Sequence, residues 1–235
     1  KIFVLPLLGA YVSGEKSIIS QRQMSIIILA GPLPGIMIGS CLLISTIYFP
    51  NERIVMLGNI FLIINLFNLL PFVPLDGGRL LETLFVNHNH TIRVIFTIIS
   101  ILALAALAIY NKSIIFIIIP VSMIFDLSME IKNQKIREYL EQEKINYTCE
   151  YANLPDSNYW SIRDCILLSF NKRYGGIQAG VHQYSVIEGG IIQHVIAVLK
   201  TPFIKDVNIF EKICIMFTYI LFLIIIPLTI YYLIK

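Results

Sequence analysis

The chain has 235 residues, of which 57% are hydrophobic and 14% are charged, and its mean hydropathy is +0.77. Soluble domains contain about 25% charged residues, so this composition excludes an ordinary soluble domain and indicates an integral membrane protein. The formal net charge of +3 is small and no basic run is interleaved with aromatic residues, so a nucleic-acid-binding protein is not indicated.

The N-terminal stretch, residues 1–23, opens with a short apolar segment and then carries glycines at positions 9 and 14. Its apolar part is too short to cross a membrane, so we expect a hairpin-like or re-entrant turn. The first residue is Lys1 rather than Met, and no signal-peptide pattern is present. We therefore expect the sequence to start part-way into a longer protein.

The remaining apolar segments predict an all-α polytopic membrane protein with about five transmembrane helices. A helix rises about 1.5 Å per residue, so about 20 apolar residues cross a hydrocarbon core of about 30 Å. The segments that reach or approach this length are 24–49, 54–75, 92–110, 113–127 and 213–234. The third and fourth are expected to form a helical hairpin, with a kink at Pro120 and Asp126 at the interface.

Residues 128–212 are polar and are predicted to form a small α+β soluble insert. Residues 130–144 have the pattern of an exposed amphipathic helix. Ser161 begins a sequence typical of a capping box that opens a second helix, and residues 181–187 are strand-like. The insert is interpreted either as a small domain that contacts the core or binds substrate, or as a solvated spacer with a modest core.

The predicted domains are a membrane-embedded core at 1–127, a cytoplasmic insert at 128–212 and a C-terminal transmembrane helix at 213–235. Positively charged loops favour the cytoplasmic side. This tendency places the insert, the N-terminal stretch and the end of segment 54–75 on that side. The richness in Ile, Asn and Lys is compatible with a bacterial cytoplasmic membrane protein from an AT-rich genome.

The end of segment 54–75 carries the sequence N-L-L-P-F-V-P-L-D-G-G-R, residues 68–79. An acid at a hydrocarbon boundary costs about 2.5 to 3.5 kcal/mol and needs a partner. Pro71 and Pro74 remove backbone donors and interrupt the helix, while Gly77 and Gly78 permit a sharp turn and close approach. We therefore expect Asp76 to be held at a helix break as a functional residue.

An earlier segment, A-G-P-L-P-G at residues 30–35, is followed by Gly39 and Ser40. Small residues let a neighbouring helix approach closely, and the prolines distort the helix. Two interpretations stay open here. Gly31 and Pro32 belong either to a kinked packing face or to the wall of an active site.

These motifs resemble the site-2 protease family of intramembrane zinc metalloproteases. The family motif Asn-x-x-Pro-x-x-x-Leu-Asp-Gly is present as Asn68, Pro71, Leu75, Asp76 and Gly77. The upstream order also agrees, because a Pro-Leu-x-Gly segment at 6–9 is followed by Ala-Gly-Pro-Leu at 30–33. The resemblance covers about residues 2–85, so that residues 1–127 would be the C-terminal part of the protease core.

The resemblance implies an enzyme that hydrolyses peptide bonds of membrane-spanning or membrane-adjacent protein substrates. Asp76 would be the third protein ligand of a catalytic Zn²⁺, beside the two histidines of a His-Glu-x-x-His helix whose Glu is the general base. Zinc with three protein ligands keeps a position for water and lowers its pKa to about 7. The residues expected to position substrate or shape the site are Asn68, Pro71, Pro74, Gly77, Gly78, Gly31 and Pro32.

The sequence departs from the family pattern in two places. The histidines are His88, His90, His182 and His194, and none has the His-Glu-x-x-His spacing, so no catalytic residue of that motif is visible. The family has it before Pro6, and we expect it upstream of the sequence shown. Gly35 stands where the family commonly has Asn. His88 and His90 are two residues apart, which suits a polar loop better than a metal site.

Three alternatives to the protease remain at this point. The chain could be a catalytically inactive relative that serves as a membrane binding or regulatory scaffold. It could be a transporter with Asp76 as a coupling-ion ligand, although no second copy of the motif is visible. Asp76 could also be a solvated helix-terminal acid paired with Arg79.

Overall fold

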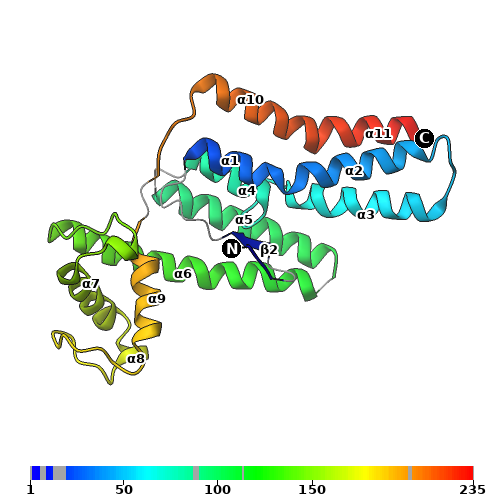
Figure 1. Ribbon diagram of the computed structural model, residues 1–235. Helices are drawn as coiled ribbons and strands as arrows, with labels where there is room; N and C mark the ends of the chain where they lie inside the picture. The colour runs from blue at the N-terminus through cyan, green and yellow to red at the C-terminus, as the bar shows by residue number, and fades with distance from the viewer. Residues whose placement is uncertain are drawn as a thin grey trace. The chain divides into compact units, whose positions relative to one another are not determined.

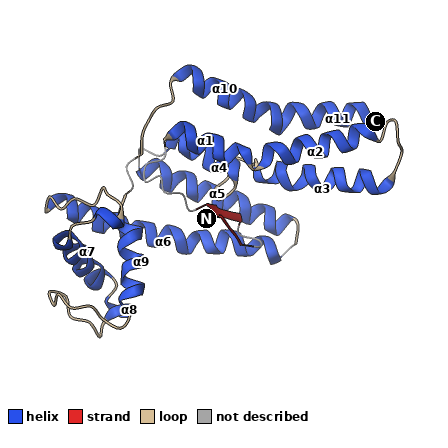
Figure 2. Ribbon diagram, viewed as in Figure 1, coloured by secondary structure: helices blue, strands red, loops and turns tan. Residues whose placement is uncertain are grey.

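The computed structural model describes residues 2–5, 9–12, 20–86, 90–112, 114–200 and 203–234, and most of these are helical (Figures 1 and 2). The chain divides into two compact units. The core unit comprises Ser20–Leu127 and Lys205–Lys235, and the insert unit comprises Lys1–Ile19 and Ser128–Ile204. Each unit is described by itself.

The first predicted membrane helix, 24–49, is formed by two helices, α1 (Gln21–Ala30) and α2 (Pro32–Ser45). Ser20 and Gln23 form a capping box at the start of α1. Gly31 separates the two helices, and Pro32 occupies the first position of α2, where its missing N–H costs no intrahelical hydrogen bond. Gly31 keeps right-handed helical backbone angles, so α1 and α2 follow each other directly and together form the helical stretch Gln21–Ser45.

The second predicted membrane helix is shorter than expected. α3 (Glu52–Asn68) begins at an Asn51 cap and ends at Asn68, so the predicted end at residue 75 is wrong. α2 packs along α3, as drawn in Figure 1. A Cβ on Gly39 would lie 2.9 Å from the carbonyl oxygen of Gly58, so this packing requires the predicted small-residue face of α2.

The motif acid begins a new helix, α4 (Asp76–Leu81), which continues into a π-helical turn, η1 (Glu82–Val86). A π-helical turn leaves backbone carbonyls without their usual partners. The fully buried Gln21 amide in α1 donates to the carbonyls of Thr83 and Leu84, at 2.8 and 3.3 Å. This contact joins the start of α1 to the end of the motif helix.

The predicted helical hairpin consists of α5 (His90–Tyr110) and α6 (Ile114–Gln142). α6 is one continuous helix with Pro120 inside it, whereas the sequence was expected to form two helices, 113–127 and 130–144. The separate helices are wrong because residues 127–130, Leu-Ser-Met-Glu, contain no glycine or proline to end the first of them.

The C-terminal helix begins earlier than predicted, at an Asn208–Glu211 capping box. It comprises α10 (Ile209–Ile220), the π-helical turn η3 (Leu221–Ile225) and α11 (Ile226–Ile234). Pro227 follows η3 and cannot donate to the carbonyl of Leu223, which explains a wider turn at this point.

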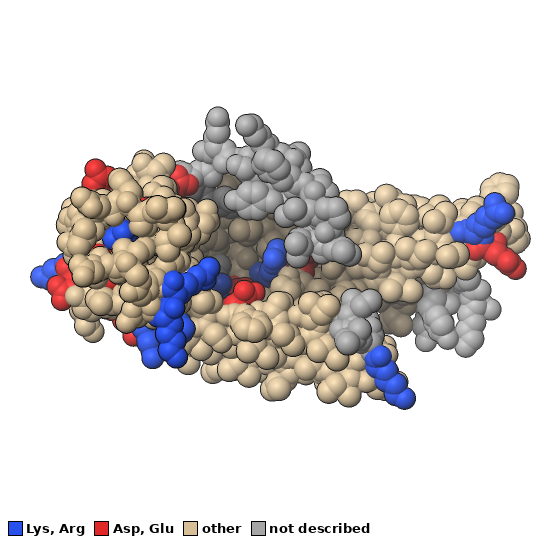
Figure 3. Space-filling view, turned by 90° about the horizontal axis from the view of Figure 1, so that it is seen from below, with Lys and Arg blue, Asp and Glu red and all other residues tan. Residues whose placement is uncertain are grey.

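Among the described residues, three helical stretches are long and apolar enough to cross a membrane, namely Gln21–Ser45, His90–Tyr110 and Ile209–Ile230. On the face shown in Figure 3, long parts of the surface carry no charged side chain. Many large apolar residues of these helices are exposed, including Ile99 at 53% and Ile213 at 61%. These features are consistent with a membrane protein.

The insert unit contains β1 (Ile2–Leu5) and β2 (Gly9–Val12), an antiparallel pair as expected for a hairpin, while the connecting residues 6–8 lie outside the described part. Its helices are the end of α6, η2 (Tyr151–Asn153), α7 (Asp156–Ser169), α8 (Asn171–Tyr174) and α9 (Glu188–Val198). They enclose a hydrophobic core that includes Ile162, Ile166, Ile191 and Val195. The insert therefore has a core of its own.

Two expectations for the insert are wrong. Ser161 lies in the middle of α7, because the helix already begins at Asp156 directly after Pro155, and its hydroxyl donates to the carbonyl of Ser157. Residues 181–187 form an extended loop and a turn without strand pairing. Their backbone is held by side chains, as described below, and not by a sheet.

Candidate functional site

The candidate site lies where α3 ends and α4 begins. Residues 69–75 form a series of tight turns, in which Phe72 donates to the carbonyl of Leu70 and Leu75 donates to the carbonyl of Phe72. The peptide bond between Val73 and Pro74 is cis. This segment, called the break loop below, brings the chain from the end of one helix to the acid that starts the next.

Two side chains from distant helices hold the break loop. The buried Tyr219 hydroxyl in α10 donates to the carbonyl of Leu69 at 2.8 Å, and the buried Ser100 hydroxyl in α5 accepts from the N–H of Val73 at 3.1 Å. Neither residue was predicted from the sequence as part of the site. Their signal was a polar side chain within an apolar segment, because such groups need a partner away from water.

The two motif glycines allow the break loop to fold back onto α4. A Cβ on Gly77 would lie 2.1 Å from the carbonyl oxygen of Leu69, and a Cβ on Gly78 would lie 2.2 Å from the carbonyl carbon of Phe72. Both obstacles are backbone atoms and cannot rotate away. Glycine at these two positions is therefore a packing requirement for the observed loop.

Asp76 lies against the junction of α1 and α2. Its atom Oδ2 would stand 3.5 Å from a Cβ placed on Gly31, and α1 packs on α4. The side chain of Asp76 is partly buried. The two motifs singled out in the sequence, 30–35 and 68–79, thus meet in space at these two residues.

Gly35 has a neighbour that fills its missing side-chain volume. The amide of Asn65 in α3 lies against Gly35, so that a Cβ there would come within 2.1 Å of Asn65 Nδ2. The same amide donates to the carbonyl of Phe61 at 2.7 Å. The space beside Gly35 is therefore occupied by an asparagine amide from α3 and not by a side chain of α2 itself.

The other predicted site residues lie around this junction with less specific roles. Asn68 is the last residue of α3, and Pro71 and Pro74 lie in the break loop, all partly buried. Within the described part of the chain, no hydrogen bond joins the side chain of Asn68 to Asp76. Pro32 is buried at the start of α2. These residues shape the backbone around Asp76.

A catalytic zinc site needs three protein ligands, and the described residues supply one candidate, Asp76. Among the residues that the structure describes, no three His, Cys, Asp or Glu side chains gather in a way that could hold a metal ion. His88 and the Pro-Leu-Leu segment at 6–8 lie outside these residues. The described residues therefore do not form a complete zinc site.

The two histidines of the insert unit have structural contacts. His182 stacks on Trp160 with 5.1 Å between ring centroids. His194 stacks on Phe170, and its Nδ1 lies 2.7 Å from the hydroxyl of Tyr174. Burial, together with the nearby Arg173, lowers the pKa of His194. Both histidines serve the packing of the insert.

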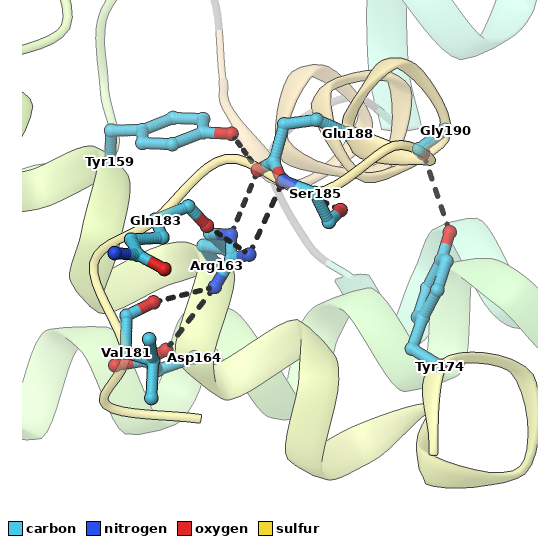
Figure 4. A network of polar contacts seen from close by, with 9 residues as sticks. All are labelled: Tyr159, Arg163, Asp164, Tyr174, Val181, Gln183, Ser185, Glu188 and Gly190. Carbon is cyan, nitrogen blue, oxygen red and sulfur yellow. Dashed lines mark hydrogen bonds and ion pairs between the residues drawn. The ribbon is translucent and has the colours of Figure 1, made fainter. Parts of the chain in front are cut away.

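A buried ion pair anchors the loop 181–187 to α7 (Figure 4). The fully buried guanidinium of Arg163 contacts both carboxylate oxygens of Glu188, at 2.8 and 3.2 Å, and donates to the carbonyls of Val181 and Gln183. Burial alone would raise the pKa of Glu188, but hydrogen bonds from Arg163, Tyr159 and Ser185 outweigh it and lower the pKa to about 2. Arg163 therefore replaces the strand pairing that the sequence suggested.

Comparison of the chain with protein-family profiles, with characterised proteins and with solved structures found no match.

Proposed function

We propose that the chain is part of an intramembrane zinc metalloprotease of the site-2 protease type, with Asp76 as one of the metal ligands. The observation that carries the proposal is the position of Asp76 at the junction of α1 and α2, with Oδ2 3.5 Å from a Cβ built on Gly31. Gly31 and Asp76, one from each motif of the resemblance, are 45 residues apart in sequence. Their contact is what a shared site requires.

The proposal includes five membrane crossings, with α3 and the first part of α6 added to the three candidate spans. α3 has 17 residues, which gives a length of about 26 Å. It packs along α2, itself part of a candidate span. The cytoplasmic side is assigned to the Asp76 end by the positive charge of the adjoining polar segments.

The described residues would do three things for the reaction. Asp76 would offer a carboxylate oxygen, a ligand that zinc accepts. Tyr219 and Ser100 would keep the break loop rigid, so that this oxygen stays in place. The interrupted helices would leave polar backbone near the acid, which is tolerated at membrane depth only where protein or water surrounds it. A cleavable substrate segment must be unwound to pair with such backbone.

A catalytically inactive relative that acts as a membrane scaffold is the second candidate function. The observation that favours it is that, within the described part of the chain, no three His, Cys, Asp or Glu side chains gather around Asp76 or elsewhere. The two candidates differ in one requirement. The protease needs a His-Glu-x-x-His segment outside the 235 residues, whereas the scaffold does not, so the coding sequence directly upstream distinguishes them.

Cleavage of a membrane-spanning test substrate by the full-length protein in liposomes tests the proposal. The wild type is expected to cleave, and a zinc chelator is expected to stop cleavage until zinc is returned. Asp76→Asn should abolish activity, whereas the matched variant Asp126→Asn, at an exposed acid of α6, should retain it. Full activity of Asp76→Asn would reject the protease assignment to this residue.

A further inference from the structure

A groove on the core unit runs along one flank of α10. It has a volume of about 520 Å³ and is lined by Phe85 of η1 and by residues of α10, namely Ile209, Lys212, Ile213, Met216, Phe217 and Ile220. The α10 residues recur at steps of three and four and so form a single helix face. Lys212 is the one charged side chain among the lining residues.

The groove lies on a helix with the length and composition of a membrane span. α10 belongs to the candidate span Ile209–Ile230, and the lining side chains Phe85, Ile213 and Phe217 are 55%, 61% and 62% exposed. In a bilayer, the medium that meets such side chains is the acyl chain of a lipid. An apolar groove on this flank is thus filled from the membrane and not from water.

The length of the groove matches one leaflet. Its residues on α10 extend from Ile209 to Ile220, which is a rise of about 16 Å along the helix. Half of a hydrocarbon core of about 30 Å is about 15 Å. A single extended acyl chain of one leaflet therefore matches the groove in length.

Lys212 lines the groove with the apolar part of its side chain, and its ammonium beside the groove provides a site for an anionic headgroup. Lys212 lies in the first turn of α10, and its Nζ is 5.6 Å from the ring centroid of Phe85 at the groove. Its acidic neighbour, Glu211, is engaged by the guanidinium of Arg22 and by the Asn208 cap. Lysine at such a position extends its ammonium to the membrane interface.

We propose that this groove binds an anionic phospholipid, with one acyl chain along the α10 flank and the headgroup phosphate on Lys212. Lys212 lies in the first turn of α10, near the helix end where the lipid phosphates would be. The apolar lining extends along α10 over about the length of the acyl chain of one leaflet. This proposal depends on membrane insertion and is independent of the proteolytic activity. A basic residue near the surface contributes about fivefold in lipid association, which corresponds to about 1 kcal/mol.

Quenching of a tryptophan reporter by brominated lipids tests the site in the full-length protein in nanodiscs. Phe217→Trp places the reporter in the groove, and the matched control Phe210→Trp lies on the same helix, is 73% exposed and does not line the groove. The parent protein, whose one tryptophan is Trp160, provides the blank. Phosphatidylglycerol and phosphatidylcholine with the same brominated chains are compared at equal mole fraction.

The groove reporter should associate with the anionic lipid about fivefold more strongly than with the zwitterionic one. Lys212→Gln should remove this preference, Lys212→Arg should keep it, and the control reporter should show none. Equal quenching by both lipids at Phe217→Trp would mean ordinary annular lipid and would overturn the proposal. A preference that survives Lys212→Gln, or the absence of quenching because a protein segment fills the groove, would overturn it as well.

Discussion

Oδ2 of Asp76 and the α-carbon of Gly31 face each other so closely that a Cβ on Gly31 would stand 3.5 Å from the carboxylate oxygen. This separation is an ordinary van der Waals contact, so one added methyl group fits beside the carboxylate. Gly31 therefore keeps the space beside the acid open. The relationship ties two sequence motifs to one place in the fold.

Substitutions at Gly31 should show a steep dependence on size. Gly31→Ala should keep most of the proteolytic activity, because its methyl group meets Asp76 at contact distance. Gly31→Val adds atoms that must displace the carboxylate, and a displacement of about 1 Å in a catalytic site costs about 100-fold in rate. Initial cleavage rates in liposomes measure both. Equal rates for the two variants would show that the space beside Asp76 is not needed.

The close contacts of the break loop predict that Gly77→Ala and Gly78→Ala destabilise the core unit. Each Cβ would come within about 2.2 Å of backbone atoms, and overpacking of this kind costs about 1–3 kcal/mol or more. Gly189→Ala is the matched control, since nothing lies within 4 Å of its Cβ and the position is helical. Thermal unfolding in detergent measures the melting temperature of each variant. Melting temperatures of Gly77→Ala and Gly78→Ala no lower than that of Gly189→Ala would contradict the observed loop.

Removing the hydroxyl of Tyr219 should weaken the hold of α10 on the break loop. Tyr219→Phe leaves the carbonyl of Leu69 without its donor in a buried place, at a cost of about 1 kcal/mol. Tyr110→Phe, at a tyrosine that is 86% exposed, serves as the control. Denaturant titration of both proteins measures the difference in the free energy of unfolding. Identical values would mean that the hydrogen bond contributes nothing to stability.

The insert unit should lose stability in acid because of Glu188. Its pKa is about 2 in the fold, below the ordinary value of 4.5. A carboxylate with a lowered pKa contributes stability above about pH 4.5, and this contribution is lost as the pH falls from 4.5 through 2. The single tryptophan, Trp160, lies over the guanidinium of Arg163 and reports on this network.

The measurement for Glu188 is Trp160 fluorescence in denaturant titrations at pH 6, 4 and 2. Glu188→Gln should be less stable than the wild type at pH 6 and should show a weaker pH dependence. Glu143→Gln, at an exposed acid, should follow the wild type. A pH dependence that is unchanged in Glu188→Gln would assign the acid sensitivity to other groups.

Several elements of the core unit could be predicted from the sequence because their signals are local. The apolar runs indicated α5 and the final helix, and the prolines and glycines of the motif indicated a break before Asp76. The close approach of α3 to α2 at Gly39 was predicted from the small residues of α2, which are also a local signal. Composition, length and residue type decide these features without knowledge of neighbours.

The remaining features depend on partners far away in the chain. Ser100 and Tyr219 are 27 and 150 residues from the backbone atoms that they hold, so no local pattern reveals the pairing. The strand predicted at 181–187 failed because its backbone is bound by Arg163 of another helix.

The central claim, that Asp76 binds a catalytic metal ion, is tested most directly by the zinc content of the purified full-length protein. The account predicts about one zinc per chain in the wild type and in Asp126→Asn, and a loss of most of the zinc in Asp76→Asn when all three proteins elute as folded, monodisperse species. Zinc in Asp76→Asn at the level of the wild type, or a wild type without zinc after loading and dialysis, would contradict the claim.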